Sequence, residues 1–329
     1  MPTIESAFAP PFFLRNGHLQ TILPVLFPRR IRLHFTRERL ELEDGDFLDL
    51  DWARARRSRL AILTHGLEGD SSAGYVRGMA KALREAGWDV LAWNFRSCGG
   101  ISNRLPRFYH SGETGDLRTI VRHVEKSYPR IALVGFSLGG NVTLKYLGEA
   151  PPSPHIESAV AISTPVDLAS SAHALGDRGG NRLYLRRFLK TLIAKVEAKA
   201  ALFPDVLDAR DARRLRNLHE FDDRFTAPLH GFRDANDYWT QSSSRQFLGR
   251  IRIPTLLLNA RNDPFLTDAS FPVAEAAANS SFHLEAPESG GHVGFLDLRR
   301  GLQPYSEWRT VQFLDVAAEK LGGSPVEAR

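Results

Sequence analysis

The sequence predicts an α/β fold, with a mainly parallel twisted sheet, helices on both faces and a helical lid insertion. Three observations predict it. Short apolar runs alternate with stretches of helical periodicity through most of the 329 residues. The alternation is broken once, over residues 168–248, where helical periodicity continues without apolar strands. A tight Gly-Phe-Ser-Leu-Gly turn at residues 135–139 joins a strand to a helix.

The first 50 residues predict an arm followed by a hairpin. Residues 1–30 are rich in proline and aromatic residues, which excludes a long helix and favours an arm packed across the domain. Residues 31–42 alternate in part and predict a strand. A turn at 44–46 and a second strand from Phe47 to Leu50 complete the hairpin, which we expect at an edge of the sheet.

The rest of the core follows in alternation. Apolar runs predict buried strands at residues 60–64, 88–93, 131–134, 156–162, 254–258 and 282–286. Helical periodicity predicts helices at residues 73–86, 113–128, 138–147, 270–278 and 308–321. We therefore expect an α/β core of residues 1–167 and 249–329, and a lid of residues 168–248. Helical periodicity within the lid covers residues 183–202, 205–224 and 227–247.

Composition limits the classes of protein that fit. The net charge of +5 is spread among acidic residues, which favours a solvated surface over a nucleic-acid site. The single cysteine, Cys98, excludes an internal disulfide and a cysteine-based zinc site. No signal peptide or membrane-length apolar run occurs, so we expect a soluble, cytoplasmic protein without stable membrane insertion. No phosphate-binding glycine motif or His/acid cluster is present, so no cofactor and no metal are expected.

Ser137 is the predicted nucleophile. It sits in a strand–turn–helix context, where the turn is sharp and flanking glycines remove Cβ atoms that would clash. The serine oxygen is then exposed at the top of the sheet. The helix N-terminus behind it favours a nearby oxyanion.

A serine hydroxyl needs a base, and the base needs an orienting acid. In sheets of this type such groups gather at the carboxyl ends of strands. Ser137, Asp263 and His292 each follow an apolar run, in the order nucleophile, acid, base. Asp268 and Asp167 are the alternatives for the acid.

The other histidines are weaker candidates for the base than His292. His283 lies within the last predicted strand and is expected to be structural. His65 is expected to tie its loop by hydrogen bonds. His110 and His18 lie in predicted loops and could line the pocket. For the oxyanion, the expected donors are the backbone N–H groups of the lining residues Leu138 and Leu67.

Five segments together resemble the YheT-like branch of the α/β-hydrolase superfamily. They are His65–Gly69, Asn94–Arg96, Tyr109–Thr114, Gly135–Gly139 and Arg15–Pro24. The resemblance covers about residues 10 to 320 and is weakest in the helical insertion. It implies the α/β-hydrolase fold and the triad Ser137, Asp263 and His292. One departure is Ser97-Cys98-Gly99, where the family pattern has a glycine directly after Arg96.

These observations predict a serine hydrolase that cleaves carboxylic esters of short to medium acyl chains through an acyl-enzyme. Its partner would be a small-molecule or lipid-like ester; the oligomeric state is left open. The alternatives are an acyltransferase, a lipid-directed, phospholipase-like hydrolase and, in other classes, a non-catalytic ligand-binding scaffold or a protein that uses Arg186, Arg187 and Lys190 at a membrane surface.

Overall fold

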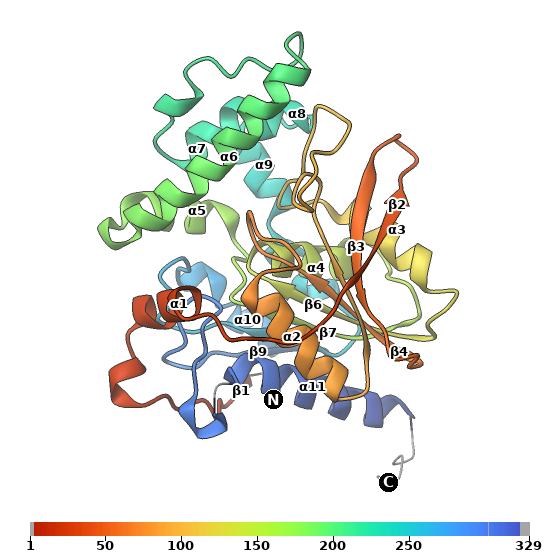
Figure 1. The fold of residues 1–329 in the computed structure, drawn as a ribbon. Helices are drawn as coiled ribbons and strands as arrows, with labels where there is room; N and C mark the ends of the chain where they lie inside the picture. The colour runs from red at the N-terminus through yellow and green to blue at the C-terminus, as the bar shows by residue number, and fades with distance from the viewer. Residues whose placement is uncertain (1–2, 302, 323–329) are drawn as a thin grey trace.

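A nine-stranded sheet forms the centre of the computed structural model, which describes residues 3–301 and 303–322 (Figure 1). Its strands lie in the order β1-β9-β8-β7-β6-β4-β5-β3-β2. They are β1 Thr3–Ile4, β2 Thr36–Glu41, β3 Phe47–Ala53, β4 Arg59–Thr64, β5 Asp89–Trp93, β6 Arg130–Phe136, β7 Ile156–Ile162, β8 Thr255–Leu258 and β9 Phe282–Glu285. β3 pairs antiparallel with β2 and β5, and the other neighbours are parallel. The predicted mainly parallel sheet is confirmed.

Helices cover both faces of this sheet, as predicted. On one face lie α2 Gly74–Glu85 and α11 Tyr305–Gly322. On the other lie α3 Thr114–Val124, α4 Leu138–Glu149 and α10 Val273–Ala278. Because the central strands are buried on both sides, their sequences are continuous apolar runs rather than alternating ones. That is why these strands could be recognised from the sequence.

The hairpin of β2 and β3 lies at one edge, as expected, with Gly45 in the left-handed region at φ +82°. The predicted strand was too long, because β2 begins at Thr36 and residues 31–35 are not in a strand. The other edge was not predicted. There, the two residues of β1 pair with β9.

The N-terminal arm differs from its prediction in two ways. It contains a 3-10 turn, Phe12–Leu14, and a ten-residue helix, α1 Gly17–Leu26, that includes Pro24. The aromatic residues do not all pack on the domain. Phe8 is buried against Phe295 and Tyr305, with ring centroids 5.7 and 5.2 Å apart. Phe12 and Phe13, in contrast, are 81% and 54% exposed.

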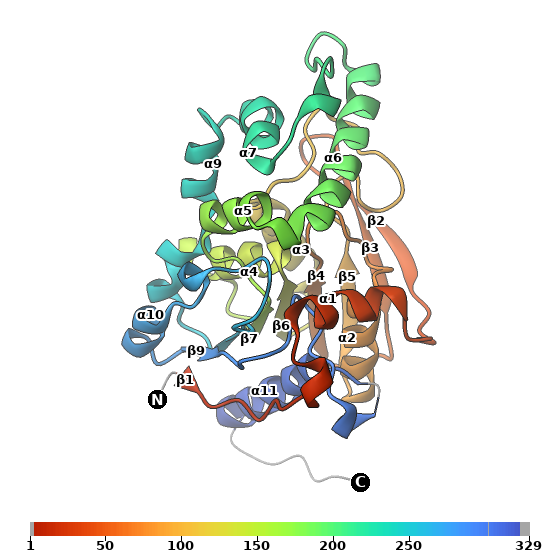
Figure 2. The same cartoon turned by 90° about the vertical axis from the view of Figure 1, so that its left-hand side faces the viewer.

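The helical segment of residues 168–248 stacks at one end of the sheet, above α4 in two perpendicular views (Figures 1 and 2). It contains α5 Leu168–Asp177, α6 Arg182–Leu202, α7 Leu218–Phe221, α8 Ala227–Leu229 and α9 Ala235–Ser242. The predicted helix over 183–202 is confirmed as α6. Short 3-10 turns occupy Gly179–Asn181, Ala212–Arg214, Ser244–Arg250, Asp268–Ser270 and Leu298–Arg300, and a π-helical turn spans Asp222–Thr226.

Residues 205–224 and 227–247 are not long helices, contrary to the periodicity of their sequence. α9 begins anew at Asp234, whose side chain accepts from the backbone of Asp237 at 2.8 Å. α7 begins in the same way at Asn217. Gly231, at φ +76°, lies between α8 and α9 and interrupts the helical path. Local breakers and caps therefore prevail over the 3.6-residue pattern.

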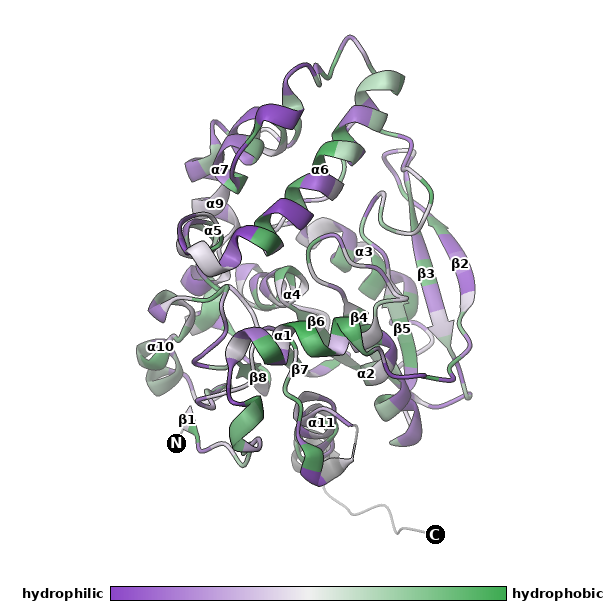
Figure 3. Ribbon diagram, turned by 60° about the vertical axis from the view of Figure 1, so that its left-hand side comes forward, coloured by the Kyte–Doolittle hydropathy of each residue, from purple (hydrophilic) through white to green (hydrophobic). Residues whose placement is uncertain are grey.

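The helix α6 carries mixed hydropathy along its length (Figure 3). Its apolar residues, including Leu189, Leu192 and Val196, pack with Phe221 and Phe225 in a core separate from that of the sheet. The buried Lys199 donates to the backbone oxygen of Asn103 at 2.6 Å. Within the part of the chain that the structure describes, no helix is long and apolar enough to cross a membrane.

Candidate active site

Ser137 occupies the turn between β6 and α4, in a strained backbone conformation with φ 51° and ψ −119°. This left-handed region is costly for a residue with a Cβ, so the surrounding packing must hold it. A Cβ on Gly139 would collide with the backbone oxygens of Thr64 and His65. Glycine is therefore required there for β6 and α4 to approach β4 this closely.

The structure brings the three predicted triad residues together. The Nε2 atom of His292 lies 2.9 Å from Oγ of Ser137, and its Nδ1 atom lies 2.8 Å from Oδ2 of Asp263. The Asp263 side chain is fully buried, and its Oδ1 atom also accepts from the backbone N–H of Phe265 at 2.9 Å. The Phe265 ring packs on the imidazole, with centroids 4.3 Å apart. The histidine ring is thus held from two sides.

The arm helix α1 supports the loop that carries His292. Oγ1 of Thr21 accepts from the backbone N–H of His292 at 2.8 Å. The fully buried Gln20 accepts from the N–H of Leu296 at 2.7 Å and donates to the carbonyls of Leu296, at 3.3 Å, and Leu14, at 2.8 Å.

Asn262, next to Asp263, links the same pieces from the other side. Its Nδ2 atom donates to the carbonyl of Arg15 at 2.6 Å, and its Oδ1 atom accepts from the N–H of Gly291 at 3.1 Å. The sequence analysis assigned no role to Gln20, Thr21 or Asn262. Gln20 and Thr21 lie in the Arg15–Pro24 segment, which entered that analysis only as part of the family resemblance.

The two expected oxyanion donors lie beside Ser137. Leu138 is the first residue of α4, where an N–H has no carbonyl within the helix to bond. No described residue accepts from the N–H of Leu67. Its neighbour Gly66 approaches closely, because a Cβ built there would be 3.2 Å from the Cβ of Ser137. Both leucine side chains also line the cavity described below.

The loop of Leu67 is fixed through Glu68, which has φ +55°. Its backbone N–H donates to the hydroxyl of Tyr109 at 2.9 Å, and that hydroxyl donates to Oε1 of Glu68 at 2.7 Å. The ammonium of Lys195, on α6, reaches the same Oε1 atom at 2.6 Å. The helical segment is therefore tied directly to the loop that would bind the oxyanion.

The alternative acids lie elsewhere. Asp167 caps α5 by accepting from the backbone of Ser170 at 2.9 Å. Asp268 is exposed in a 3-10 turn. Cys98 lies near Lys195, with Sγ 3.3 Å from Nζ, and burial raises the pKa of its thiol to about 11. A thiol with a raised pKa is a poor nucleophile at neutral pH.

The other histidines have separate surroundings. His65 accepts from the N–H of Phe95 at 3.1 Å and lies 2.8 Å from the carbonyl of Gly66, and burial lowers its pKa to about 4. It ties its loop, as expected. His18 contacts the hydroxyl of Tyr184 at 3.1 Å. His283 is in β9, and His110 lines the cavity.

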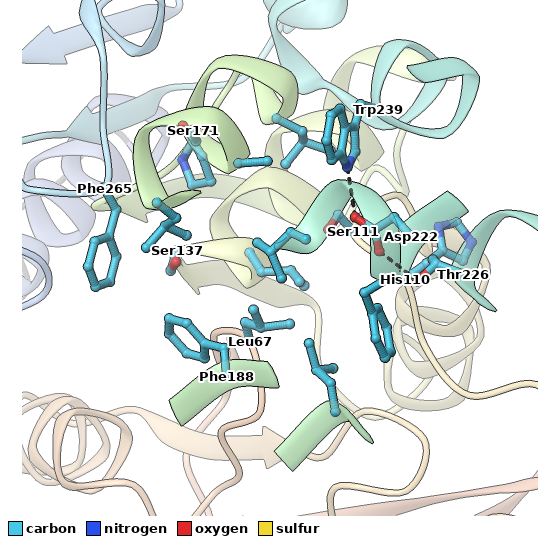
Figure 4. A pocket seen from close by; sticks show the side chains of 18 of the residues that line it. Leu67, His110, Ser111, Ser137, Ser171, Phe188, Asp222, Thr226, Trp239 and Phe265 are labelled. Atoms are coloured by element: carbon cyan, nitrogen blue, oxygen red, sulfur yellow. Dashed lines mark hydrogen bonds between the residues drawn. The ribbon is translucent and has the colours of Figure 1, made fainter. Parts of the chain in front are cut away.

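A cavity of about 110 Å³ opens next to Ser137. Most of its lining is apolar: Leu67, Phe108, Leu138, Leu168, Ala172, Leu175, Phe188, Leu192, Leu218, Phe221, Phe265 and Leu266. Polar side chains also line it: His110, Ser111, Ser171, Asp222 and Thr226. In Figure 4, Ser137 lies near Phe265, Phe188 and Leu67, whereas Asp222, Thr226 and His110 lie at the opposite side of the cavity. The wall of this cavity is therefore not apolar throughout.

Among the described residues, no group of three or more histidine, cysteine, aspartate or glutamate side chains is placed to hold a metal ion.

Comparison with known proteins places the chain among hydrolases. A family model described as the alpha/beta hydrolase fold matches residues 62–297. The chain is 37% identical over 300 residues to "Putative esterase YheT" of Escherichia coli, covering 89% of this chain and 88% of that protein. It is 27% identical to "Phospholipase ABHD3" of Bos taurus, covering 90% and 75%. It is 30% identical to "Monoacylglycerol lipase" of Saccharomyces cerevisiae, covering 75% and 57%.

Solved structures show the same fold. An esterase from Pyrococcus furiosus superposes with a TM-score of 0.58 at 19% sequence identity, covering 88% of this chain and 92% of that one. A membrane phospholipase A described as a bacterial virulence factor gives a TM-score of 0.55 at 18% identity, covering 91% and 94%. At these identities the likeness concerns the fold alone.

Proposed function

The chain belongs to the α/β-hydrolase family, and we propose that it is a serine esterase that cleaves carboxylic esters of short to medium acyl chains. One observation carries the proposal: the chain of contacts from Ser137 through His292 to Asp263, at 2.9 and 2.8 Å. The relatives named as an esterase, a phospholipase and a monoacylglycerol lipase support an ester as the substrate.

The reaction begins with attack of the Ser137 oxygen on the ester carbonyl, while Nε2 of His292 takes the hydroxyl proton. Asp263 keeps the other ring nitrogen protonated and stabilises the imidazolium that forms. The negative charge on the former carbonyl oxygen is bound by the N–H groups of Leu67 and Leu138. When the tetrahedral adduct collapses, His292 protonates the departing alcohol, and an acyl-enzyme remains.

Water completes the cycle. His292 takes a proton from the water as its oxygen attacks the acyl-enzyme, and then returns a proton to Ser137 as the acid leaves. We propose that residues 168–248 act as a lid, because they supply Leu175, Phe188 and Leu192 to the cavity wall. The volume of about 110 Å³ is close to that of engineered cavities of about 150 Å³ that bind benzene. This size supports a short to medium acyl chain.

The test is Ser137→Ala with p-nitrophenyl butyrate as substrate. We expect kcat to fall by at least about 10⁴-fold while the unfolding midpoint is retained. Ser72→Ala, which removes an exposed serine hydroxyl, is the matched control and should keep its activity. Full activity in Ser137→Ala would refute the proposal.

Two further measurements separate this proposal from its rivals. A fluorophosphonate probe should label Ser137 in the wild type, and an inert binding scaffold would not be labelled. Turnover in the presence of ethanol distinguishes hydrolysis from acyl transfer, since a transferase would yield mainly the ethyl ester rather than the free acid.

A further inference from the structure

The cavity beside Ser137 contains a carboxyl group that the ester chemistry does not use. Asp222 begins the π-helical turn of residues 222–226 and lines the cavity on the side away from Ser137 (Figure 4). Its Oδ1 atom accepts from the hydroxyl of Thr226 at 2.7 Å, and its Oδ2 atom accepts from the indole N–H of Trp239 at 2.8 Å. A carboxylate has about four acceptor positions, so two remain.

The remaining acceptor positions matter because Asp222 is only half-buried and it lines the cavity. Burial raises the pKa of Asp222 to about 6, so the site carries the cost of a poorly hydrated carboxylate at neutral pH. A protein that needed only an apolar acyl pocket would place an apolar side chain there. A carboxylate is useful where a ligand brings a hydrogen-bond donor.

A second polar group in the same cavity lacks a partner. The hydroxyl of Ser171, on α5, is buried with the residue 5% exposed, and no described residue bonds to it. Ser171 also lines the cavity. A buried hydroxyl without a partner is costly, so its presence points to a bound molecule that completes its hydrogen bonding.

The charges around the cavity limit what that molecule can carry. No lysine or arginine occurs among the described residues that line it. A carboxylate or phosphate at the far side would face Asp222 without a compensating cation, and would be repelled. A neutral hydroxyl group, in contrast, can donate to Asp222 and needs no counter-charge.

We propose that the preferred acyl group carries a hydroxyl at its distal end, which donates a hydrogen bond to Asp222 while the ester carbonyl lies at Ser137. The inference rests on the proposed esterase function and refines its substrate class to hydroxyacyl esters. The apolar wall between the two ends contacts the methylene groups of the chain. Asp222 acts here as a specificity-determining residue, remote from the reacting atoms.

The test compares esters of equal size. Ethyl 6-hydroxyhexanoate and ethyl heptanoate differ only in a terminal hydroxyl against a methyl group, and hydrolysis of both can be followed by pH-stat titration. A purely apolar pocket prefers the methyl compound. We expect the opposite, a kcat/KM for the hydroxy ester at least about tenfold higher, because a hydrogen bond to a charged group favours the substrate that can make it. The shorter and longer members of both series locate the best chain length.

The substitution Asp222→Asn tests the assignment of the residue. The ratio of the two kcat/KM values should fall by about tenfold or more in this variant. The matched control, Asp205→Asn, removes an exposed carboxylate of the same helical segment and should leave the ratio unchanged. If Asp222→Asn does not fold, the ratio of the two kcat/KM values in the wild type still shows whether hydroxyacyl esters are preferred, because that measurement needs no variant.

Several outcomes would overturn the inference. They are a preference of the wild type for ethyl heptanoate at every chain length, an unchanged ratio in Asp222→Asn, and a preference for the monoethyl ester of heptanedioic acid, whose end carries a carboxylate. Each of them leaves the esterase proposal intact provided that the alkyl esters are turned over and Ser137 is labelled by a fluorophosphonate. Loss of both labelling and turnover would instead refute the esterase proposal itself.

Discussion

Replacing Gln20 with leucine tests whether the N-terminal arm positions His292, the proposed catalytic base. The leucine has a similar size but makes none of the three hydrogen bonds of the glutamine side chain. The carbonyl of Leu14, which is buried, then loses its side-chain partner, and so do the backbone N–H and carbonyl of the partly buried Leu296.

The magnitude follows from these three groups. A buried polar group left unpaired costs about 1–3 kcal/mol, and a partly buried one less, because water reaches it. Together they give a loss of about 2–5 kcal/mol in the free energy of unfolding, a large share of the 5–15 kcal/mol typical of a native protein. Because Leu296 lies four residues after His292, we also expect the imidazole to shift and kcat to fall by at least about tenfold.

Urea unfolding and ester turnover measure the two effects. The slope of free energy against urea concentration should stay the same, so that the midpoint alone reports the loss. Gln241→Leu, at an exposed glutamine of α9, is the control and should change stability by less than about 0.5 kcal/mol. A loss below about 1 kcal/mol in Gln20→Leu, with unchanged kcat, would refute the idea that the arm supports the His292 loop.

Three further predictions concern the site. Asp263→Asn should lower kcat by about 10⁴-fold, because an amide no longer holds the imidazole tautomer, whereas Asp268→Asn, at the exposed alternative, should keep full turnover; equal effects would contradict the assignment. Lys195→Met should lower kcat roughly tenfold with little change in KM, since it removes the tie between α6 and Glu68 in the proposed oxyanion loop and leaves only the bonds from Tyr109, while Lys190→Met on the exposed face of α6 should match the wild type in steady-state kinetics. Burial raises the pKa of Asp222 from 3.8 to about 6, so the folded state retains a proton that the unfolded chain releases near pH 4, and the contribution of Asp222 to stability falls as pH rises from about 4 to 6. Urea unfolding at pH 4 and pH 7 should therefore show the stability of the wild type, relative to Asp222→Asn, decreasing by no more than about 3 kcal/mol; a relative increase would contradict this sign.

The sheet was predictable because its physics is local. Strands such as β5 and β8 are buried on both faces. The sequence of each is therefore a mostly apolar run that ends where the strand ends. The rule that functional groups follow the carboxyl ends of strands then selects Ser137, Asp263 and His292 from many candidates. Chain order and this rule were enough to predict that the three side chains meet, and the structure adds the distances of 2.9 and 2.8 Å between them.

The support of the His292 loop by α1 could not be predicted, because it depends on contacts between distant segments, which hydrophobic periodicity does not reveal. Nothing local in the sequence of α1 indicates that Gln20 and Thr21 bond a loop more than 270 residues later. The predicted helices over residues 205–224 and 227–247 were wrong for a different reason. Capping residues such as Asn217 and Asp234 start new helices within a continuous 3.6-residue pattern. Asp222 was overlooked because it lies in the charged stretch of residues 205–224. In the sequence alone, an acidic residue that faces a cavity cannot be distinguished from one that faces solvent.

The bonds from Thr21 to His292 and from Asn262 to Arg15 span 271 and 247 residues of sequence. During synthesis Thr21 leaves the ribosome 271 residues before the histidine that it holds. A nascent chain that has already folded its central strands would therefore display Ser137 without a fixed proton acceptor. Esterase activity would therefore report a molecule in which the arm has docked on the His292 loop.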